Sequence, residues 1–196
     1  MSVLTADFFA RDTVTVAQEL LGKQLVRNLP GGGQVAVTIT ETEAYVGPID
    51  KACHAYQYKR TPRTRTMFSP PGTAYIYLIY GMYHCLNLVT EAAGEPCAVL
   101  IRGARAGENV DIIAKNRFGC KYDQLTPYQR KNLLNGPGKL CKALNLTRAE
   151  DGSSVLSPAG GLYLLDAPAP EAFHTGKRIG IDYAEEAVDF PWRFWL

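Results

Sequence analysis

Two glutamates, Glu41 and Glu43, stand two residues apart at the end of a run of alternating apolar residues. If this run is a strand, both carboxylates lie on one face, about 6.5 Å apart along the backbone. Inverting glycosidases hold an acid and a base about 6.5–9.5 Å apart, and retaining glycosidases about 5–5.5 Å apart. A two-carboxylate sugar hydrolase is therefore one candidate, and a solvated strand face is the chemically inert alternative.

The surroundings favour Glu43 as the group that does chemistry. Tyr45 lies on the same alternate face, and an arginine-rich stretch begins just downstream. A carboxylate flanked by aromatic rings and arginines can stay ionised and activate a water molecule. His54 is a further candidate, although a single histidine in a loop is more often a structural hydrogen-bonding group.

The forty residues from Lys51 to Thr90 contain no aspartate or glutamate, but they contain five lysines and arginines and six of the eleven tyrosines. The net charge of the whole chain is +2, so the other 156 residues sum to −3. Positive charge follows phosphates, and tyrosine rings stack on bases. The stretch therefore indicates a basic, aromatic surface that binds nucleic acid. The alternative is a tyrosine-rich sheet core beside a solvated loop.

Other kinds of chemistry find little support. The chain has three histidines in no metal-binding pattern and lacks a G-x-S-x-G motif, so we expect no metal, no cofactor and no serine catalysis. The segment 135–139, Asn-Gly-Pro-Gly-Lys, could bind a phosphate at a helix start, or could simply begin a helix.

Length and composition predict one soluble domain over residues 1–196, since 196 residues with 46% apolar content suffice for one core. The N-terminus lacks an export signal, and no stretch approaches the ~18 apolar residues that span a bilayer. We therefore expect no membrane association and a cytoplasmic location, associated with the nucleoid if the source is bacterial.

The pattern along the chain predicts strands interleaved with helices, without a regular βαβ rhythm. A long loop is expected over 47–72, and a hairpin over 73–89 that turns at Gly81-Met82. The helices are expected at 12–21, 109–118, 126–134 and 138–144, and the remaining strands at 25–26, 35–39, 98–102, 161–165 and 177–182.

Several motifs stand in a specific order: Glu-Thr-Glu-Ala-Tyr at 41–45, Thr-Pro-Arg at 61–63, Gly-Thr-Ala-Tyr-Ile-Tyr-Leu-Ile-Tyr-Gly-Met-Tyr at 72–83 and Gly-Pro-Gly-Lys-Leu-Cys at 136–141. With these motifs the chain resembles the alkyladenine (3-methyladenine, methylpurine) DNA glycosylase family of the mammalian type, from about residue 5 to about residue 190. Pattern and resemblance together predict an α+β fold in one compact domain, with a mostly antiparallel curved sheet, surrounding helices and a protruding β-hairpin.

The resemblance implies a monofunctional enzyme that acts on double-stranded DNA containing damaged purines, and we expect this enzyme to be a monomer. It would flip alkylated or deaminated purines, such as 3-methyladenine, 7-methylguanine, hypoxanthine and ethenoadenine, out of the duplex and hydrolyse the N-glycosidic bond. Cationic purines would gain a cation–π interaction against tyrosine faces. No lysine stands beside Glu43 to form a Schiff base, so no strand-cleaving lyase activity is expected.

The resemblance also assigns roles to residues. Glu43 matches the general base, Arg102 the residue that helps hold the attacking water, and Tyr45, His54 and Tyr77 the walls that stack on the flipped base.

Further along, Asn87 matches a pocket residue that discourages guanine, and Tyr80 the side chain that wedges into the vacated duplex. Met82 and Tyr83 match its flanking contacts. The basic candidates for DNA contact are Arg63 and Lys139.

Three hypotheses thus remain, and mutation of the two glutamates separates them. A glycosylase predicts a severe Glu43→Gln and a mild Glu41→Gln, whereas a sugar hydrolase needs both carboxylates. A non-catalytic nucleic-acid-binding module needs neither. A carboxylate beside a stacking tyrosine repels phosphates and weakens binding unless it serves the chemistry, which favours the enzyme.

Overall fold

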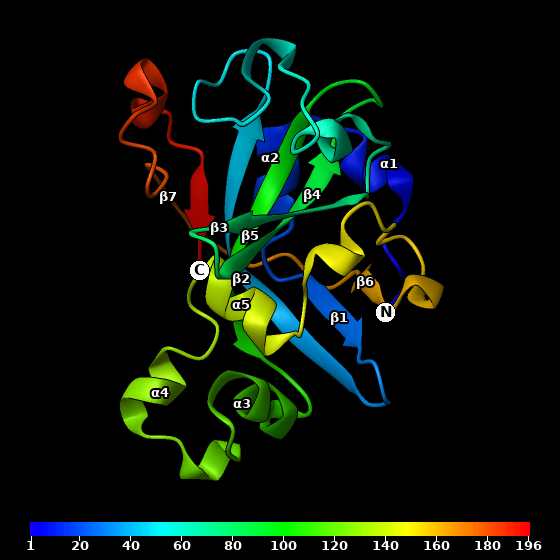
Figure 1. The fold of residues 1–196 in the computed structure, drawn as a ribbon, viewed down its shortest axis with the longest axis vertical. Coiled ribbons are helices and arrows are strands. Elements are labelled where there is room, and N and C mark those ends of the chain that lie inside the picture. The colour runs from blue at the N-terminus through cyan, green and yellow to red at the C-terminus, as the bar shows by residue number, and fades with distance from the viewer.

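The computed structural model describes residues 1–196, and its centre is a curved, eight-stranded antiparallel sheet (Figure 1). The strands are β1 (Gln24–Asn28), β2 (Gln34–Val46), β3 (Ala74–Ile79), β4 (Tyr83–Thr90), β5 (Cys97–Ala106), β6 (Leu162–Leu165), β7 (His174–Gly176) and β8 (Arg193–Trp195). The α-helices are α1 (Ala6–Phe9), α2 (Thr13–Glu19), α3 (Val110–Phe118), α4 (Pro127–Lys131) and α5 (Pro137–Ala143). The fold is α+β with an antiparallel sheet, as predicted.

The long strand β2 organises the sheet, whose main order is β3-β4-β5-β2-β1-β6. One edge of β2 pairs with β5, and the other pairs first with β1 and then, from Glu41 to Glu43, with β8. The register between β2 and β5 shifts at Glu41, opposite Gly103. A Cβ on Gly103 would lie 3.2 Å from the Cβ of Glu41, so the glycine makes room for this irregularity.

Local signals account for the helix boundaries. The carboxylate of Asp12 caps α2 by accepting a hydrogen bond from the amide of Thr15 at 2.8 Å. Thr126 caps α4 in the same way, and a proline follows it at the first helical position. The predicted helix over 126–134 is shorter in the structure, where α4 ends at Lys131.

The main hydrophobic core lies between one face of the sheet and the helices. It joins Leu20 and Leu21, next to α2, to Leu88 of β4, Ile101 of β5 and Phe194 of β8. Burial of these side chains, worth roughly 1.5–3 kcal/mol each, holds α2 and α5 on this face. The opposite face is left for the long loop and the C-terminal segment.

The long loop over 47–72 contains only turns and two 3₁₀ helices, at Tyr56–Tyr58 and Arg65–Phe68, as the proline-rich sequence predicts. It packs on the sheet through a second cluster that includes Cys53, Met67 and Tyr75. A third cluster joins Ala52 of this loop to Ile181 near the C-terminus. Both clusters reach Tyr45, so loop and C-terminal segment meet at β2.

Two strand predictions are wrong. Residues 177–182 form no strand; Gly180 has a φ of +76° and the segment turns across the sheet. The strand that contains Arg102 does not end there but continues to Ala106. None of the helices has the length and apolar character that crossing a bilayer requires.

Candidate active site

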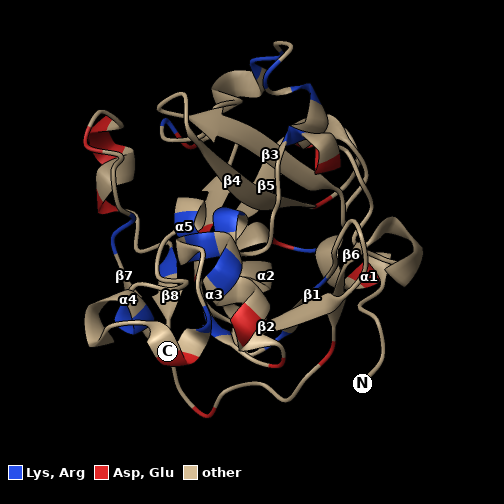
Figure 2. Cartoon of the chain, turned by 60° about the horizontal axis from the view of Figure 1, so that its bottom comes forward, with Lys and Arg blue, Asp and Glu red and all other residues tan.

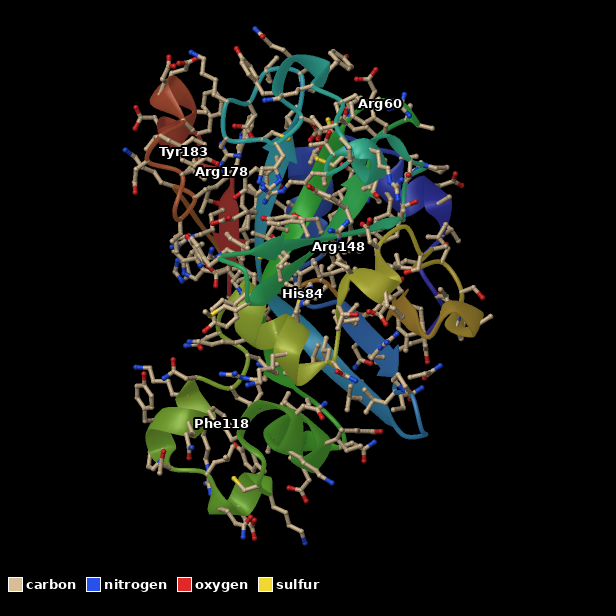
Figure 3. All side chains as sticks on the ribbon, viewed as in Figure 1. Arg60, His84, Phe118, Arg148, Arg178 and Tyr183 are labelled. Carbon is tan, nitrogen blue, oxygen red and sulfur yellow. The ribbon has the colours of Figure 1, made fainter.

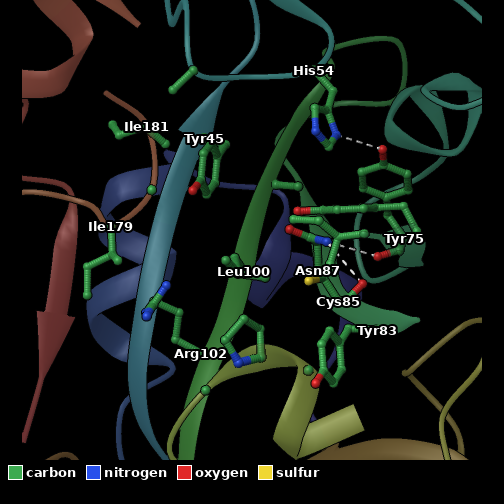
Figure 4. Close-up of a pocket in the computed structure, with 18 of the residues that line it drawn as sticks. Tyr45, His54, Tyr75, Tyr83, Cys85, Asn87, Leu100, Arg102, Ile179 and Ile181 are labelled. Atoms are coloured by element: carbon green, nitrogen blue, oxygen red, sulfur yellow. Dashed lines mark hydrogen bonds between the residues drawn. The ribbon is translucent and has the colours of Figure 1, made fainter. Parts of the chain in front are cut away.

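A cavity of about 630 Å³ opens on the sheet face that is turned away from the main core (Figure 4). The register explains its floor, because Tyr75 of β3, Asn87 of β4, Leu100 of β5 and Glu43 of β2 pair in one row across four strands. Directly paired residues share a face, as do residues two apart on a strand. The neighbouring positions Tyr77, Cys85 and Arg102 therefore also line the cavity.

Glu43 lies at the edge of this cavity with a fully buried side chain. The Tyr45 hydroxyl donates to its Oε2 at 2.8 Å, and the Ile179 amide donates to its Oε1 at 2.9 Å. Nη1 of Arg102 lies 3.5 Å from the same Oε1. The carboxylate is therefore held in one orientation by residues that line the cavity.

Burial raises the pKa of Glu43 above its ordinary value. The Arg102 charge, the Ile179 amide and the Tyr45 hydroxyl all favour the ionised carboxylate and oppose this rise, while Glu41 adds to it. Such a balance suits a general base, whose pKa should lie close to the operating pH.

Arg102 joins the two glutamates instead of leaving them side by side. Its Nε donates to Oε1 of Glu41 at 2.9 Å, and its Nη1 faces Glu43. Nη1 of Arg193 lies 3.7 Å from the same Glu41 oxygen. The Glu41 carboxylate thereby holds Arg102 beside Glu43.

The aromatic side chains that line the cavity include Tyr45, His54 and Tyr77. The His54 and Tyr77 rings meet edge to face with centroids 4.6 Å apart, and Tyr45 lies across the cavity on β2 (Figure 4). Burial, with a smaller effect of Arg63, lowers the pKa of His54 to about 4. His54 is therefore neutral near pH 7, and its Nδ1 lies 3.1 Å from the Tyr75 hydroxyl.

The C-terminal segment forms a further wall that the sequence did not reveal. Ile179, Ile181 and Tyr183 line the cavity beside Tyr45. The anchor is Arg178, whose buried guanidinium pairs with both oxygens of Asp50 and donates to two backbone carbonyls (Figure 3). The sequence predicted a strand over 177–182, and no signal in the sequence pointed to this wall.

Asn87 is buried beneath the cavity, and its amide group donates to the carbonyls of Tyr75 at 3.1 Å and Cys85 at 3.4 Å. Both contacts use the amide nitrogen, so the carboxamide group is held in one orientation. The side chain is thus fixed within the site, as the resemblance implied for a residue that selects among purines.

The β3–β4 hairpin presents Tyr80 and Met82 at its tip, with 82% and 68% of their surfaces exposed. Tyr80 has a φ of +53° and Gly81 a φ of +69°, so the chain reverses tightly there. A left-handed tyrosine is uncommon and costs backbone energy. Tyr80 and Tyr83 also line the cavity mouth, whereas Met82 faces a neighbouring depression.

Residues 51–90 were predicted to form a basic, aromatic surface, and two of them do not contribute to it as expected. Lys51 is paired with Glu185 and Glu186, at 2.6 and 2.9 Å, so these carboxylates offset its charge. Tyr75 is buried. Arg63 lies on the outer side of Tyr77 and does not line the cavity, whereas Lys139 does.

A second group of lysines and arginines lies along α3 and α5, close to the cavity (Figure 2). It includes Arg117 and Lys139, which line the cavity themselves. Burial lowers the pKa of Lys139, and nearby Arg117 lowers it further. Its ammonium donates to the side-chain oxygens of Asn132 and Asn135 at 2.8 and 2.9 Å. The segment 135–139 thus places a positive charge at the rim of the site.

No cluster of histidine, cysteine, aspartate and glutamate in the chain could hold a metal ion. The catalytic potential of the site lies in one buried carboxylate, one arginine and an aromatic cavity.

The family model described as methylpurine-DNA glycosylase (MPG) matches residues 7–196. The chain belongs to this family. Its members are DNA-repair hydrolases that cleave N-glycosidic bonds, and the chain is thereby an enzyme of that class. A Clostridium perfringens (strain SM101 / Type A) protein is 50% identical over 195 residues, which cover 98% of this chain and 95% of that protein. It is provisionally described as a 3-methyladenine DNA glycosylase.

Two other relatives carry the same provisional description. The Alkaliphilus oremlandii protein is 46% identical over 98% of this chain and 95% of its own length. The Methanocella arvoryzae protein is 50% identical over 100% of this chain and 92% of its own length. The similarity to this glycosylase family therefore extends over almost the whole chain.

Proposed function

We propose that the protein is a monofunctional glycosylase that excises alkylated and deaminated purines from double-stranded DNA. The damaged nucleotide rotates out of the duplex into the cavity, and a water activated by Glu43 attacks C1′ of its sugar. The base leaves with the electrons of the N-glycosidic bond, and the abasic sugar gains the hydroxyl. The observation that carries this proposal is the buried Glu43 carboxylate, held by Tyr45, Arg102 and Ile179 beside an aromatic cavity.

The cavity suits a purine by its lining and its polarity. Tyr45 and Tyr77 offer ring faces on which a base can stack, an interaction worth about 1–3 kcal/mol per base. His54, neutral and hydrogen-bonded to Tyr75, adds no charge to the wall. Asn87 crowds the exocyclic amino group of normal guanine, which favours purines without that group.

The exposed hairpin tip supports base flipping. Tyr80 is a large ring at the end of a tight turn, and it can fill the gap that the extracted nucleotide leaves. Extraction costs a few kcal/mol, least where pairing is already damaged. Met82 and Tyr83 contact the flanking bases, Lys139 contacts the phosphates, and one copy of the chain acts as a monomer.

The sugar-hydrolase alternative is weakened by the position of Glu41. A two-carboxylate mechanism needs both groups at the substrate, yet the Glu41 carboxylate is engaged by Arg102 and Arg193, whereas Glu43 is held beside the cavity by Tyr45 and Ile179. The binding-module alternative leaves the buried Glu43 without a role. A charged carboxylate is costly to bury, so it would lower stability without a gain in binding.

The test uses duplex oligonucleotides that contain a single 7-methylguanine or hypoxanthine. Wild type and Glu43→Gln are incubated with each duplex, abasic sites are scored by cleavage in alkali, and binding is measured alongside. We expect the variant to bind the duplex and to release the base about 10²- to 10⁴-fold more slowly, the usual worth of a general base. Without alkali, both should leave the strand uncut, since no lyase chemistry is proposed.

Two outcomes would contradict the proposal. Equal rates for wild type and Glu43→Gln would remove Glu43 from the mechanism. Binding by both proteins with no release of any methylated or deaminated purine would leave only the binding module.

A further inference from the structure

Two tyrosines that line the cavity, Tyr45 and Tyr77, each have an arginine over one face of the ring. The Cζ of Arg178 lies 4.7 Å from the ring centroid of Tyr45, and the Cζ of Arg63 lies 5.0 Å from that of Tyr77. Both rings line the cavity and neither arginine does. Each guanidinium therefore covers its ring from outside.

The two arginines differ in how their charge is balanced. Arg178 is fully buried and forms a two-point ion pair with Asp50, so the pair presents little net charge to Tyr45. Arg63 is exposed and forms no ion pair with a carboxylate. Its charge behind Tyr77 is therefore not offset by a partner.

The other groups around Arg63 do not cancel this charge. Nη2 of Arg63 lies 3.5 Å from Nε2 of His54, which is neutral near pH 7. Arg63 shares a small outer depression with Arg148 and Asp151, which contribute one positive and one negative charge. The Asp151 carboxylate already accepts from the Ile76 amide and the Thr66 hydroxyl.

We propose that Arg63 sets the preference between cationic and neutral purines, by holding a positive charge behind Tyr77 that disfavours a cationic base. The inference rests on the proposed function and names a specificity-determining residue within it. From the sequence, cationic purines are expected to gain a cation–π interaction against the tyrosine faces. The proposal reverses this expectation for Tyr77, because a ring that already has a guanidinium on its other face attracts a cationic base less strongly.

The charge difference between the two kinds of lesion persists through the reaction. A cationic base starts at +1 and leaves neutral when it takes the electrons of the N-glycosidic bond, whereas an unprotonated neutral base starts at zero and leaves as an anion. At each stage the two differ by one unit of charge. The effect of Arg63 on the ratio of their kcat/KM values is therefore the same wherever the transition state lies.

The distances give the expected size. A base stacked about 3.5 Å beyond Tyr77 lies about 8.5 Å from the guanidinium. With an effective dielectric constant of about 20–40 for this exposed arginine, one unit of charge at that distance corresponds to about a 5- to 30-fold change in rate ratio.

The experiment measures kcat/KM on one duplex sequence that contains either 7-methylguanine, which is cationic, or hypoxanthine, which is neutral. The proteins are wild type, Arg63→Gln, Arg63→Lys and Arg60→Gln. Arg60 is the matched control: it lies on the same loop over Phe68, outside the cavity lining (Figure 3). A loss of general DNA affinity changes both lesions alike and cancels in the ratio.

We expect the ratio of 7-methylguanine to hypoxanthine excision to rise about 5- to 30-fold in Arg63→Gln. Arg63→Lys, which keeps the charge, and Arg60→Gln should retain the wild-type ratio. An unchanged ratio in Arg63→Gln, with both lesions released, would overturn the role of Arg63 and leave the proposed function intact. An equal shift in Arg60→Gln would also overturn it. Release of neither lesion by wild type would remove the proposed function itself.

Discussion

Replacing Glu41 with glutamine removes a negative charge that lies next to Arg102, the residue that faces Glu43. Glu41 accepts a hydrogen bond from Nε of Arg102 at 2.9 Å, and Arg102 in turn faces Glu43. Glutamine keeps one acceptor oxygen for Arg102 but loses the negative charge. A hydrogen bond to a charged group is worth about 1.5–3 kcal/mol and a neutral one about 1 kcal/mol. We therefore expect a loss of about 1 kcal/mol, or about fivefold in kcat/KM.

The same substitution should shift the pH dependence of the reaction. The charge of Glu41 contributes to the raised pKa of Glu43, so its removal lowers that pKa. Glu43 acts as a base only when ionised, and a base with a lower pKa stays ionised to lower pH. The acid limb of kcat/KM, which reports the free enzyme, should thus move to lower pH in Glu41→Gln.

Single-turnover excision of hypoxanthine, followed from pH 4 to pH 8, measures both effects. Glu19→Gln is the matched control, since Glu19 is an exposed carboxylate on α2 that is paired with Arg11, outside the helix. This control should leave the limb where wild type has it. An acid limb that stays in place or moves upward in Glu41→Gln would refute the electrostatic reasoning. A loss as severe as that of Glu43→Gln would favour the two-carboxylate mechanism.

Two further predictions concern the hairpin tip and the C-terminal wall. Tyr80→Ala should leave the melting temperature unchanged and slow excision about 5- to 150-fold, because stacking worth about 1–3 kcal/mol is lost. The control is Tyr128→Ala, at a tyrosine on α4 that is 76% exposed, and it should excise at the wild-type rate. Equal excision rates in the two variants would remove Tyr80 from base flipping. Arg178→Met should lower the free energy of unfolding by about 3–5 kcal/mol because Asp50 stays buried and unpaired. Lys177→Met breaks the exposed ion pair with Asp189 and should lower the free energy of unfolding, measured by chemical denaturation, by less than about 1 kcal/mol. Equal losses of stability in Arg178→Met and Lys177→Met would contradict this account.

Local patterns predicted much of the secondary structure, because helix caps and tight turns depend on neighbouring residues. Asp12 caps α2 and Gly22 follows the helix with a φ of +83°, so these two neighbouring residues account for the helix expected over 12–21. The hairpin at Gly81 likewise follows from residues within one turn of each other. The strand predicted over 177–182 failed because Arg178 is drawn into an ion pair with Asp50, 128 residues away.

The residues of the candidate site were likewise predicted from the sequence only in part. The motif Glu-Thr-Glu-Ala-Tyr and the hairpin motif indicated Glu43, Tyr45, Tyr77 and Tyr80 through the resemblance, and the cavity brings these residues together or, for Glu43, directly behind its lining. The wall that contains Ile179 was missed, since its contact with Glu43 spans 136 residues. A count of charges along the chain also missed that Glu185 and Glu186 lie beside Lys51.

By itself, the sequence determined the family, the residue types available for chemistry and the local turns that present them. Only the tertiary structure decided which of these residues meet. One row of the sheet aligns Tyr75, Asn87, Leu100 and Glu43, and a shift of any strand by one residue would turn its side chains to the other face. The charge behind Tyr77 likewise depends on where a loop packs, because electrostatic effects follow distance in space and not along the chain.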